Sequence, residues 1–312
     1  MKKTTRLREL FERKEIFVLP GGSTALQARL IEIAGFECAY MSGGNTCSTI
    51  LGMADAGLAT MTEMITNAGY MANAIDIPLV SDSDTGYGNA INVRRTVQAF
   101  IRAGVSGIHI EDQINPKRCG FVSGKEIISL EEAAGKYRAA IDARNELDPD
   151  FIIMARTDSR GAVGGGFEEA LKRVKAYKEA GADVIYVEGP QSMEEVQAFR
   201  AAVDGPLLCT FSAVNPGISF KEQEELGMAC AFYPGAATAP ANIAAWEFLH
   251  DFQSRGVKAL DEFRQKTDGH PLSNFGVYDY VGFPEIRKME EKYLPEDAME
   301  KYELSVGEYT PS

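Results

Sequence analysis

The 312-residue chain has few of the residues that mark several large classes of protein. It contains one tryptophan, three histidines and five cysteines. No two cysteines are spaced as CxxC, and none combines with histidine in the pattern of a zinc site. This spacing argues against a disulfide framework and is typical of a reducing compartment, so we expect a cytoplasmic protein.

Cationic residues and long apolar runs are also scarce. There are 32 Lys and Arg against 45 Asp and Glu, a formal net charge of -13. Because nucleic acid requires a clustered cationic surface, we expect no nucleic-acid partner, whereas a few local cations can still bind a small carboxylate. The longest uncharged run, residues 229–246, contains two prolines and does not resemble a membrane span. Residues 1–15 alternate charge with Leu and Phe, which predicts a helix and no signal peptide.

Short β-rich runs alternate with longer amphipathic helical patterns along most of the chain. Eight strands are expected, at residues 16–19, 38–42, 78–82, 107–111, 151–156, 184–188, 207–210 and 229–233. Eight βα units favour a (β/α)8 barrel of the TIM type, with an open doubly wound sheet as the alternative.

The segment after the eighth strand is longer than one closing helix requires. Residues 246–263 and 284–302 read as helices, and no linker marks a second domain, so residues 1–312 are expected to form a single domain. We expect helix 284–302 to pack on another subunit, and the alternative is a helix that caps its own barrel.

Polar residues gather where the expected strands end, and in a barrel of this type the active site lies at those carboxyl ends. Asp82 and Asp84 follow the third strand within SDSDTGYG, and Glu111 ends the fourth. Such carboxylates can hold Mg²⁺, which takes few protein ligands and keeps several waters. The alternative is a turn whose aspartates cap the next helix.

A cysteine lies in the loop after the fourth strand, within KRCG. Lys117 and Arg118 precede Cys119, and Gly120 makes the loop pliable. Because neighbouring cations favour the thiolate, we expect Cys119 to exchange a proton near neutral pH. The alternative is a small loop residue without a chemical role.

Two further strand ends suggest carboxylate binding. The turn Ser42-Gly43-Gly44 offers successive N–H groups, although it could equally be a tight turn without a ligand. Arg156 could clamp a carboxylate with two hydrogen bonds or form an ion pair with Asp158 or Glu188. His109 falls in the middle of a strand, where it is either a core residue or a catalyst.

These segments together resemble the isocitrate lyase/phosphoenolpyruvate mutase superfamily, and within it the 2-methylisocitrate and dimethylmalate lyases. The resemblance runs from about residue 6 to residue 302. It rests on YMSGG at 40–44, SDSDTGYGN at 81–89, HIEDQ at 109–113, KRCG at 117–120 and MARTD at 154–158.

The resemblance implies a Mg²⁺- or Mn²⁺-dependent enzyme that cleaves or forms a C–C bond in 2-hydroxy acids. It also implies a homotetramer in which helix 284–302 is exchanged between subunits. Asp82 would bind the metal, with Asp84 and Glu111 bound directly or through water, and Cys119 would donate a proton from a loop that closes over the substrate. The 2-oxo acid portion would be held by Ser42, Gly43, Gly44 and Arg156.

Two segments depart from the lyases of this family. Position 121, usually His, is Phe121, and after the seventh strand Thr210 and Ser212 replace the usual Asn and Thr. We therefore expect a Mg²⁺-dependent C–C lyase that cleaves a 2-hydroxy di- or tricarboxylic acid, alkylmalate-like or 2-methylisocitrate-like, to pyruvate or glyoxylate and a carboxylic acid. Lys117, Arg118 and Cys119 are expected in its catalytic loop. The alternatives are an oxaloacetate-type hydrolase or decarboxylase, a phosphonate enzyme, or a barrel that only binds ligand. The expected substrate-binding residues are Tyr40, Ser42, Gly43, Gly44, Gly120, Phe121, Arg156, Glu188, Thr210 and Ser212.

Overall fold

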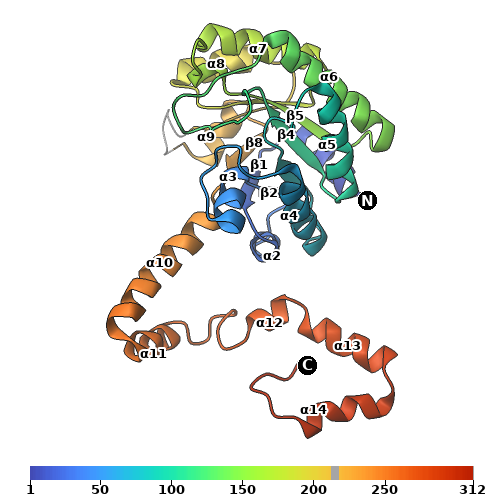
Figure 1. The fold of residues 1–312 in the computed structure, drawn as a ribbon, viewed down its shortest axis with the longest axis vertical. Coiled ribbons are helices and arrows are strands. Elements are labelled where there is room, and N and C mark those ends of the chain that lie inside the picture. Colours follow the sequence, from blue (N-terminus) through green and yellow to red (C-terminus); the bar gives the residue numbers. More distant parts are fainter. Residues whose placement is uncertain (212–217, 312) are drawn as a thin grey trace. The chain divides into compact units, whose positions relative to one another are not determined.

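A computed structural model describes residues 1–211 and 218–311 and contains all eight predicted strands (Figure 1). Their bounds are β1 Phe17–Gly22, β2 Ala39–Met41, β3 Leu79–Asp82, β4 Gly107–Glu111, β5 Ile152–Thr157, β6 Val184–Val187, β7 Leu207–Cys209 and β8 Cys230–Tyr233. The strands pair in parallel in the order β7-β6-β5-β4-β3-β2-β1-β8. The N–H of Ala229 donates to the carbonyl of Leu207 at 2.8 Å, which links the ends of this order. The nearly closed barrel confirms the predicted (β/α)8 fold.

The strands are apolar on both faces because both faces are buried, as in other parallel sheets. One cluster fills the barrel interior, where Tyr40, Met154 and Phe232 pack with residues of α1 Lys3–Glu12. A larger cluster lies between the strands and the surrounding helices. Those helices are α2 Ala25–Ile33, α3 Gly43–Thr46, the π-helical turn η1 Cys47–Leu51, α4 Met61–Ala74, α5 Ala90–Arg102, α6 Leu130–Leu147, the short η2 Ser159–Gly161, α7 Phe167–Glu179, α8 Met193–Ala202 and α9 Phe220–Glu225.

The chain divides into two compact units, Met1–Ala239 and Pro240–Ser312. The helices toward the C-terminus are α10 Thr238–Arg255, α11 Val257–Lys266, α12 Val277–Tyr280, α13 Phe283–Tyr293, η3 Glu296–Glu300 and α14 Lys301–Leu304. Among the described residues, none of the helices is long and apolar enough to cross a membrane. The single domain over residues 1–312 and the exchange of residues 284–302 between subunits stay predictions, because both concern how the second unit packs in the assembled protein.

Both helices predicted after the barrel are wrong in extent. The helix expected at residues 246–263 is interrupted at Gly256, whose φ of 60° lies in the left-handed region that favours glycine. The helix expected at residues 284–302 ends at Tyr293, and Leu294 is extended. Leu294 precedes Pro295, and the proline ring disfavours helical geometry in the residue before it.

Candidate functional site

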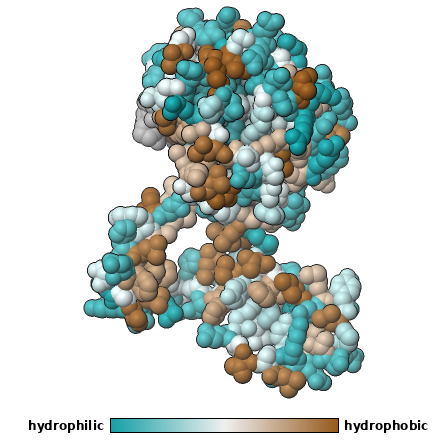
Figure 2. Space-filling view, in the orientation of Figure 1, coloured by the Kyte–Doolittle hydropathy of each residue, from teal (hydrophilic) through white to brown (hydrophobic). Residues whose placement is uncertain are grey.

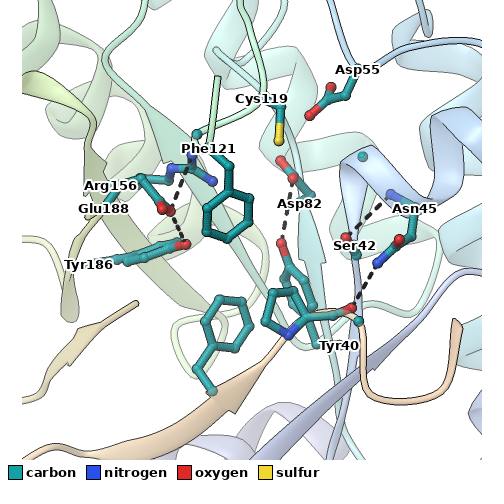
Figure 3. Close-up of a pocket in the computed structure, with 15 residues that line it drawn as sticks. Tyr40, Ser42, Asn45, Asp55, Asp82, Cys119, Phe121, Arg156, Tyr186 and Glu188 are labelled. Atoms are coloured by element: carbon teal, nitrogen blue, oxygen red, sulfur yellow. Dashed lines mark hydrogen bonds and ion pairs between the residues drawn. The ribbon is translucent and has the colours of Figure 1, made fainter. Parts of the chain in front are cut away.

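A cavity of about 400 Å³ lies at the carboxyl ends of the strands, where the barrel fold predicts an active site (Figure 3). It collects side chains from loops that are far apart in the sequence. The lining residues are Tyr40, Ser42, Gly44, Asn45, Asp55, Asp82, Cys119, Gly120, Phe121, Arg156, Tyr186, Glu188, Phe232, Pro234 and Gly235.

Asp82, the last residue of β3, is fixed by its neighbours at the base of this cavity. One carboxylate oxygen accepts the N–H of Gly43 at 3.1 Å, and the other accepts the N–H of Asp84 at 2.9 Å. A Cβ atom on residue 43 would lie 2.3 Å from Asp82, so the approach requires glycine. Burial by itself would raise the pKa of Asp82, but His109, Lys117 and Arg156 together lower it to about 2. Asp82 is therefore an anion at neutral pH. The Gly43 N–H donates to Asp82, so it is not available to a ligand. Gly44 and Asn45, together with Ser42, line the cavity.

Lys117 lies between two carboxylates. Its Nζ is 2.6 Å from an oxygen of Asp55 and 2.8 Å from an oxygen of Asp84, and the side chain is 3% exposed. Burial raises the pKa of Asp84 although Lys117 opposes the shift. Lys117 therefore neutralises Asp55 and Asp84, and it does not line the cavity itself.

Glu111 is buried beside this cluster, and neither of its carboxylate oxygens has a hydrogen-bond partner. Arg156 Nε is 3.5 Å from one of these oxygens, and burial raises the pKa of Glu111 well above its usual value. Carboxylate oxygens without partners fit a hard cation such as Mg²⁺. Among residues 1–211 and 218–311, no three His, Cys, Asp or Glu side chains converge closely enough to hold a metal directly. A site in which Asp82 is the direct ligand, and Asp84 and Glu111 act through water, needs no such group.

The prediction that its neighbours make Cys119 a thiolate is wrong. Burial raises the pKa of the Cys119 thiol. A hydrogen bond from the Phe121 backbone and the charge of Lys117 lower this pKa, but by less. Lys117 turns away toward Asp55 and Asp84, and Arg118 is exposed to solvent. The thiol thus carries its proton at neutral pH, and Figure 3 shows it pointing into the cavity in the part where Asp82 lies. A protonated thiol in this position can serve as an acid.

Arg156 on β5 forms one of the two interactions that the sequence left open. Its Nε and Nη2 donate to the two oxygens of Asp158 at 2.9 and 3.0 Å, so the predicted ion pair is present. Nη2 is also 3.4 Å from Glu188, and the guanidinium lies over the ring of Tyr186. The ion pair holds Arg156 at the cavity wall, where a guanidinium can bind a substrate carboxylate.

Glu188 follows β6 and is held by two hydroxyl groups. Tyr186 Oη donates to it at 2.5 Å and Thr210 Oγ1 donates at 2.8 Å. Thr210 therefore acts on the cavity through Glu188 and is not part of its lining. Ser212 lies outside the described residues.

His109 is a buried residue of β4, as its sequence pattern suggested. Its Nε2 is 2.7 Å from the hydroxyl of Tyr40, and Nδ1 has no partner. Burial lowers the pKa of His109 to about 4, so the ring is neutral at neutral pH. Tyr40 stands between His109 and the cavity.

Several lining residues were not predicted: Asn45, Asp55, Tyr186, Phe232, Pro234 and Gly235. Asp55 carried a signal, because it is the only charged residue between Glu37 and Glu63. Tyr186 and Phe232 lie in apolar strands and give no sign in the sequence that they reach a site.

Comparison with known proteins identifies the family. The family model described as phosphoenolpyruvate phosphomutase matches residues 7–247. The chain belongs to the phosphoenolpyruvate mutase/isocitrate lyase superfamily. Among curated members of this superfamily, 2,3-dimethylmalate lyase of Eubacterium barkeri is 39% identical over 94% of this chain and 99% of its own. A 2-methylisocitrate lyase of Aeropyrum pernix is 38% identical over 91% of this chain and 92% of its own.

Solved structures of the superfamily agree with the fold. A crystal structure of 2,3-dimethylmalate lyase superposes with a TM-score of 0.85 at 31% identity, covering 98% of this chain and 99% of that one. Oxaloacetate acetylhydrolase with 3,3-difluorooxalacetate gives 0.84 at 34% identity, covering 93% and 97%. Phosphonopyruvate hydrolase with oxalate and Mg²⁺ gives 0.82 at 29% identity, covering 95% and 100%. The predicted family is confirmed, and the curated relatives support an enzyme of the carbon–carbon lyase class.

Proposed function

We propose that the protein is a Mg²⁺-dependent lyase that cleaves a 2-hydroxy diacid into a 2-oxo acid and a carboxylic acid. The observation that carries the proposal is that one cavity contains an ionised Asp82, the guanidinium of Arg156 and the protonated thiol of Cys119. These groups are suited to hold a cation, bind a carboxylate and donate a proton. The unpaired cysteines fit a reducing cytoplasm.

Each group of the cavity has a role in this reaction. Asp82, with Asp84 and Glu111 beside it, would hold Mg²⁺, which when bound supplies positive charge that lowers the energy of an alkoxide. Arg156 and the N–H of Gly44 would bind the carboxylate of the 2-oxo acid portion. This arrangement places the second half of the substrate toward the remaining walls of the cavity.

Cleavage then moves one proton out of the substrate and one proton in. A base in the cavity removes the proton of the C2 hydroxyl, the C2–C3 bond breaks, and C2 becomes the carbonyl carbon of the 2-oxo acid. The bonding electrons remain on C3 as an enolate-like carboxylate, and Cys119 gives its proton to C3. Transfer of the first proton back to the thiolate restores the enzyme.

The cavity wall favours an alkyl-substituted substrate. Phe121 replaces the imidazole usual in related lyases, and Tyr186 and Phe232 add further aromatic surface to the lining. A carboxylate placed against a phenyl ring without a hydrogen-bond donor loses solvation that the ring does not replace. We therefore propose an alkylmalate-like substrate in place of a tricarboxylate.

A substrate screen tests the proposed activity. Purified protein with Mg²⁺ would be incubated with 2-hydroxy diacids that carry none, one or two alkyl groups, and with isocitrate and 2-methylisocitrate. Pyruvate and glyoxylate would be detected by coupled reduction. Release of acetate and oxalate from oxaloacetate, or of phosphate from a phosphonate, with no 2-oxo acid from any hydroxy acid, would replace the lyase with the corresponding hydrolase.

Phe121→His should change the choice of substrate. The imidazole supplies a donor to a third carboxylate and removes apolar surface, so kcat/KM should shift toward tricarboxylates by about 10–200-fold relative to the alkylmalate. The measurement is the ratio of kcat/KM for the two substrates in both proteins. Phe121→Leu is the control, because it stays apolar and should keep the wild-type preference. A wild-type preference for a tricarboxylate would contradict this role of Phe121.

We propose a homotetramer with exchange of helices between subunits, and an apolar surface on the second unit supports association. Ile243, Trp246 and Leu249 recur every three residues along one side of α10 and are 60–63% exposed in the single chain. Figure 2 shows further hydrophobic residues on the helices of this unit. Burial of such surfaces drives association. Light scattering at micromolar concentration should give the mass of four chains, whereas an active monomer would contradict the proposal.

A further inference from the structure

The catalytic loop, which carries Cys119, leaves the barrel after β4. Its two ends, residues 112–114 and 126–128, pair with each other. Gln113 and Ile127 form an antiparallel bridge, and the N–H of Ile114 donates to the carbonyl of Glu126 at 2.8 Å. The N–H of Ile128 donates to the carbonyl of Asp112 at 3.0 Å. These bonds fix the base of the loop but do not reach the residues at its tip, where Cys119 lies.

Gln113 holds the main chain immediately before Cys119. Its Oε1 accepts the N–H of Arg118 at 2.9 Å, and its Nε2 donates to the carbonyl of Arg118 at 2.9 Å. Gln113 is 1% exposed, so its amide group is buried, although Arg118 itself is exposed to solvent. One amide group therefore pairs both main-chain groups of Arg118, as a neighbouring strand would.

Lys125 holds the main chain immediately after Cys119. Its Nζ donates to the carbonyl of Gly120 and lies 3.3 Å from Asp158, the partner of Arg156. Gly120 packs directly on Arg156 and Glu188, because a Cβ atom there would lie 2.4 Å from Arg156 Nη2 and 2.8 Å from Glu188. Lys125, which is 5% exposed, thus connects the loop to the ion pair that orients the carboxylate-binding arginine.

We propose that Gln113 and Lys125 are positioning residues that set the place of the Cys119 thiol relative to Arg156. Neither of them lines the cavity, so they act through the main chain on each side of the thiol. The proposal rests on the proposed function, in which Cys119 protonates a carbon of a substrate whose carboxylate is bound by Arg156. When the side-chain hydrogen bonds of Gln113 or of Lys125 are removed, the thiol should leave this position more often while the barrel below it stays folded.

Alkylation of Cys119 tests the positioning without any substrate. The other four cysteines are buried, so iodoacetamide reports mainly on Cys119, and peptide mass spectrometry identifies the site. In Lys125→Met, alkylation should be at least about tenfold faster, because a buried charged hydrogen bond that closed the loop is lost. Rates measured across pH separate access from a change in the thiol's pKa. The matched control is Lys172→Met, an exposed lysine of α7 that should alkylate as wild type does.

Kinetics separate positioning from a merely structural role. Lys125→Met should lose about 10²-fold in kcat, the scale of a misplaced reacting group, with a smaller change in KM. Its melting midpoint should stay near wild type, and Lys125→Arg, which keeps a donor, should recover both alkylation and kcat in part. Gln113→Met should repeat the pattern and serves as the second variant if Lys125→Met does not fold. Unchanged alkylation, or faster alkylation with an unchanged kcat, would overturn the proposal.

If wild type cleaves no hydroxy diacid, the proposed function fails, while the alkylation rates still decide whether Gln113 and Lys125 hold the loop.

Discussion

Cys119→Ser should fold as wild type does, bind Mg²⁺ and a 2-oxo acid, and lose at least about 10²-fold in kcat, the scale of one acid–base group. A serine hydroxyl holds its proton too tightly to give it to a carbanion. Because burial raises the pKa of the thiol, wild type keeps its donor at neutral pH, and loss of this proton should lower activity on the alkaline side.

The control for this variant is Cys47→Ser. Cys47 is buried, its thiol donates to the carbonyl of Ala54 at 3.2 Å, and a serine hydroxyl can keep that bond. Cys47→Ser should therefore retain a rate close to wild type. If Cys119→Ser also turns over at nearly the wild-type rate, Cys119 is not the donor.

Removal of the metal should abolish activity, and Mg²⁺ or Mn²⁺ should restore it. Asp82→Ala should lose at least about 10³-fold, because the charge that stabilises the alkoxide is worth several kcal/mol. It should also fail to bind Mg²⁺ in calorimetry, a readout that does not depend on turnover. Asp204→Ala, an exposed aspartate in the turn before β7, is the control and should behave as wild type. Full turnover in metal-free buffer would contradict the mechanism.

The barrel could be predicted from the sequence because its strands are short apolar runs that end in polar residues. Those ends meet at one rim of a parallel barrel. The topology alone therefore predicts that Asp82, Glu111 and Arg156 share one site. The C-terminal helices could not be predicted to the same degree, because one glycine at position 256 and one proline at position 295 divide patterns that otherwise continue.

The loop after β4 shows where sequence proximity misleads. Lys117, Arg118 and Cys119 are neighbours in the chain, yet their side chains go to an acidic cluster, to solvent and into the cavity. The thiol therefore responds to its burial more than to the cations beside it. Asp55 was not predicted because it is far from Lys117 in the sequence, and only the fold brings the two side chains together.

The central claim, cleavage of a C–C bond with proton donation to the carbon fragment, is tested most directly by NMR analysis of the products formed in D₂O. From an alkyl-substituted malate and Mg²⁺, wild type should form equal amounts of a 2-oxo acid and a carboxylic acid. The carboxylic acid should carry one deuterium at the carbon that was bonded to C2. Products that contain oxalate but no 2-oxo acid, or an unreacted hydroxy diacid beside hydrolysed oxaloacetate, would contradict the account.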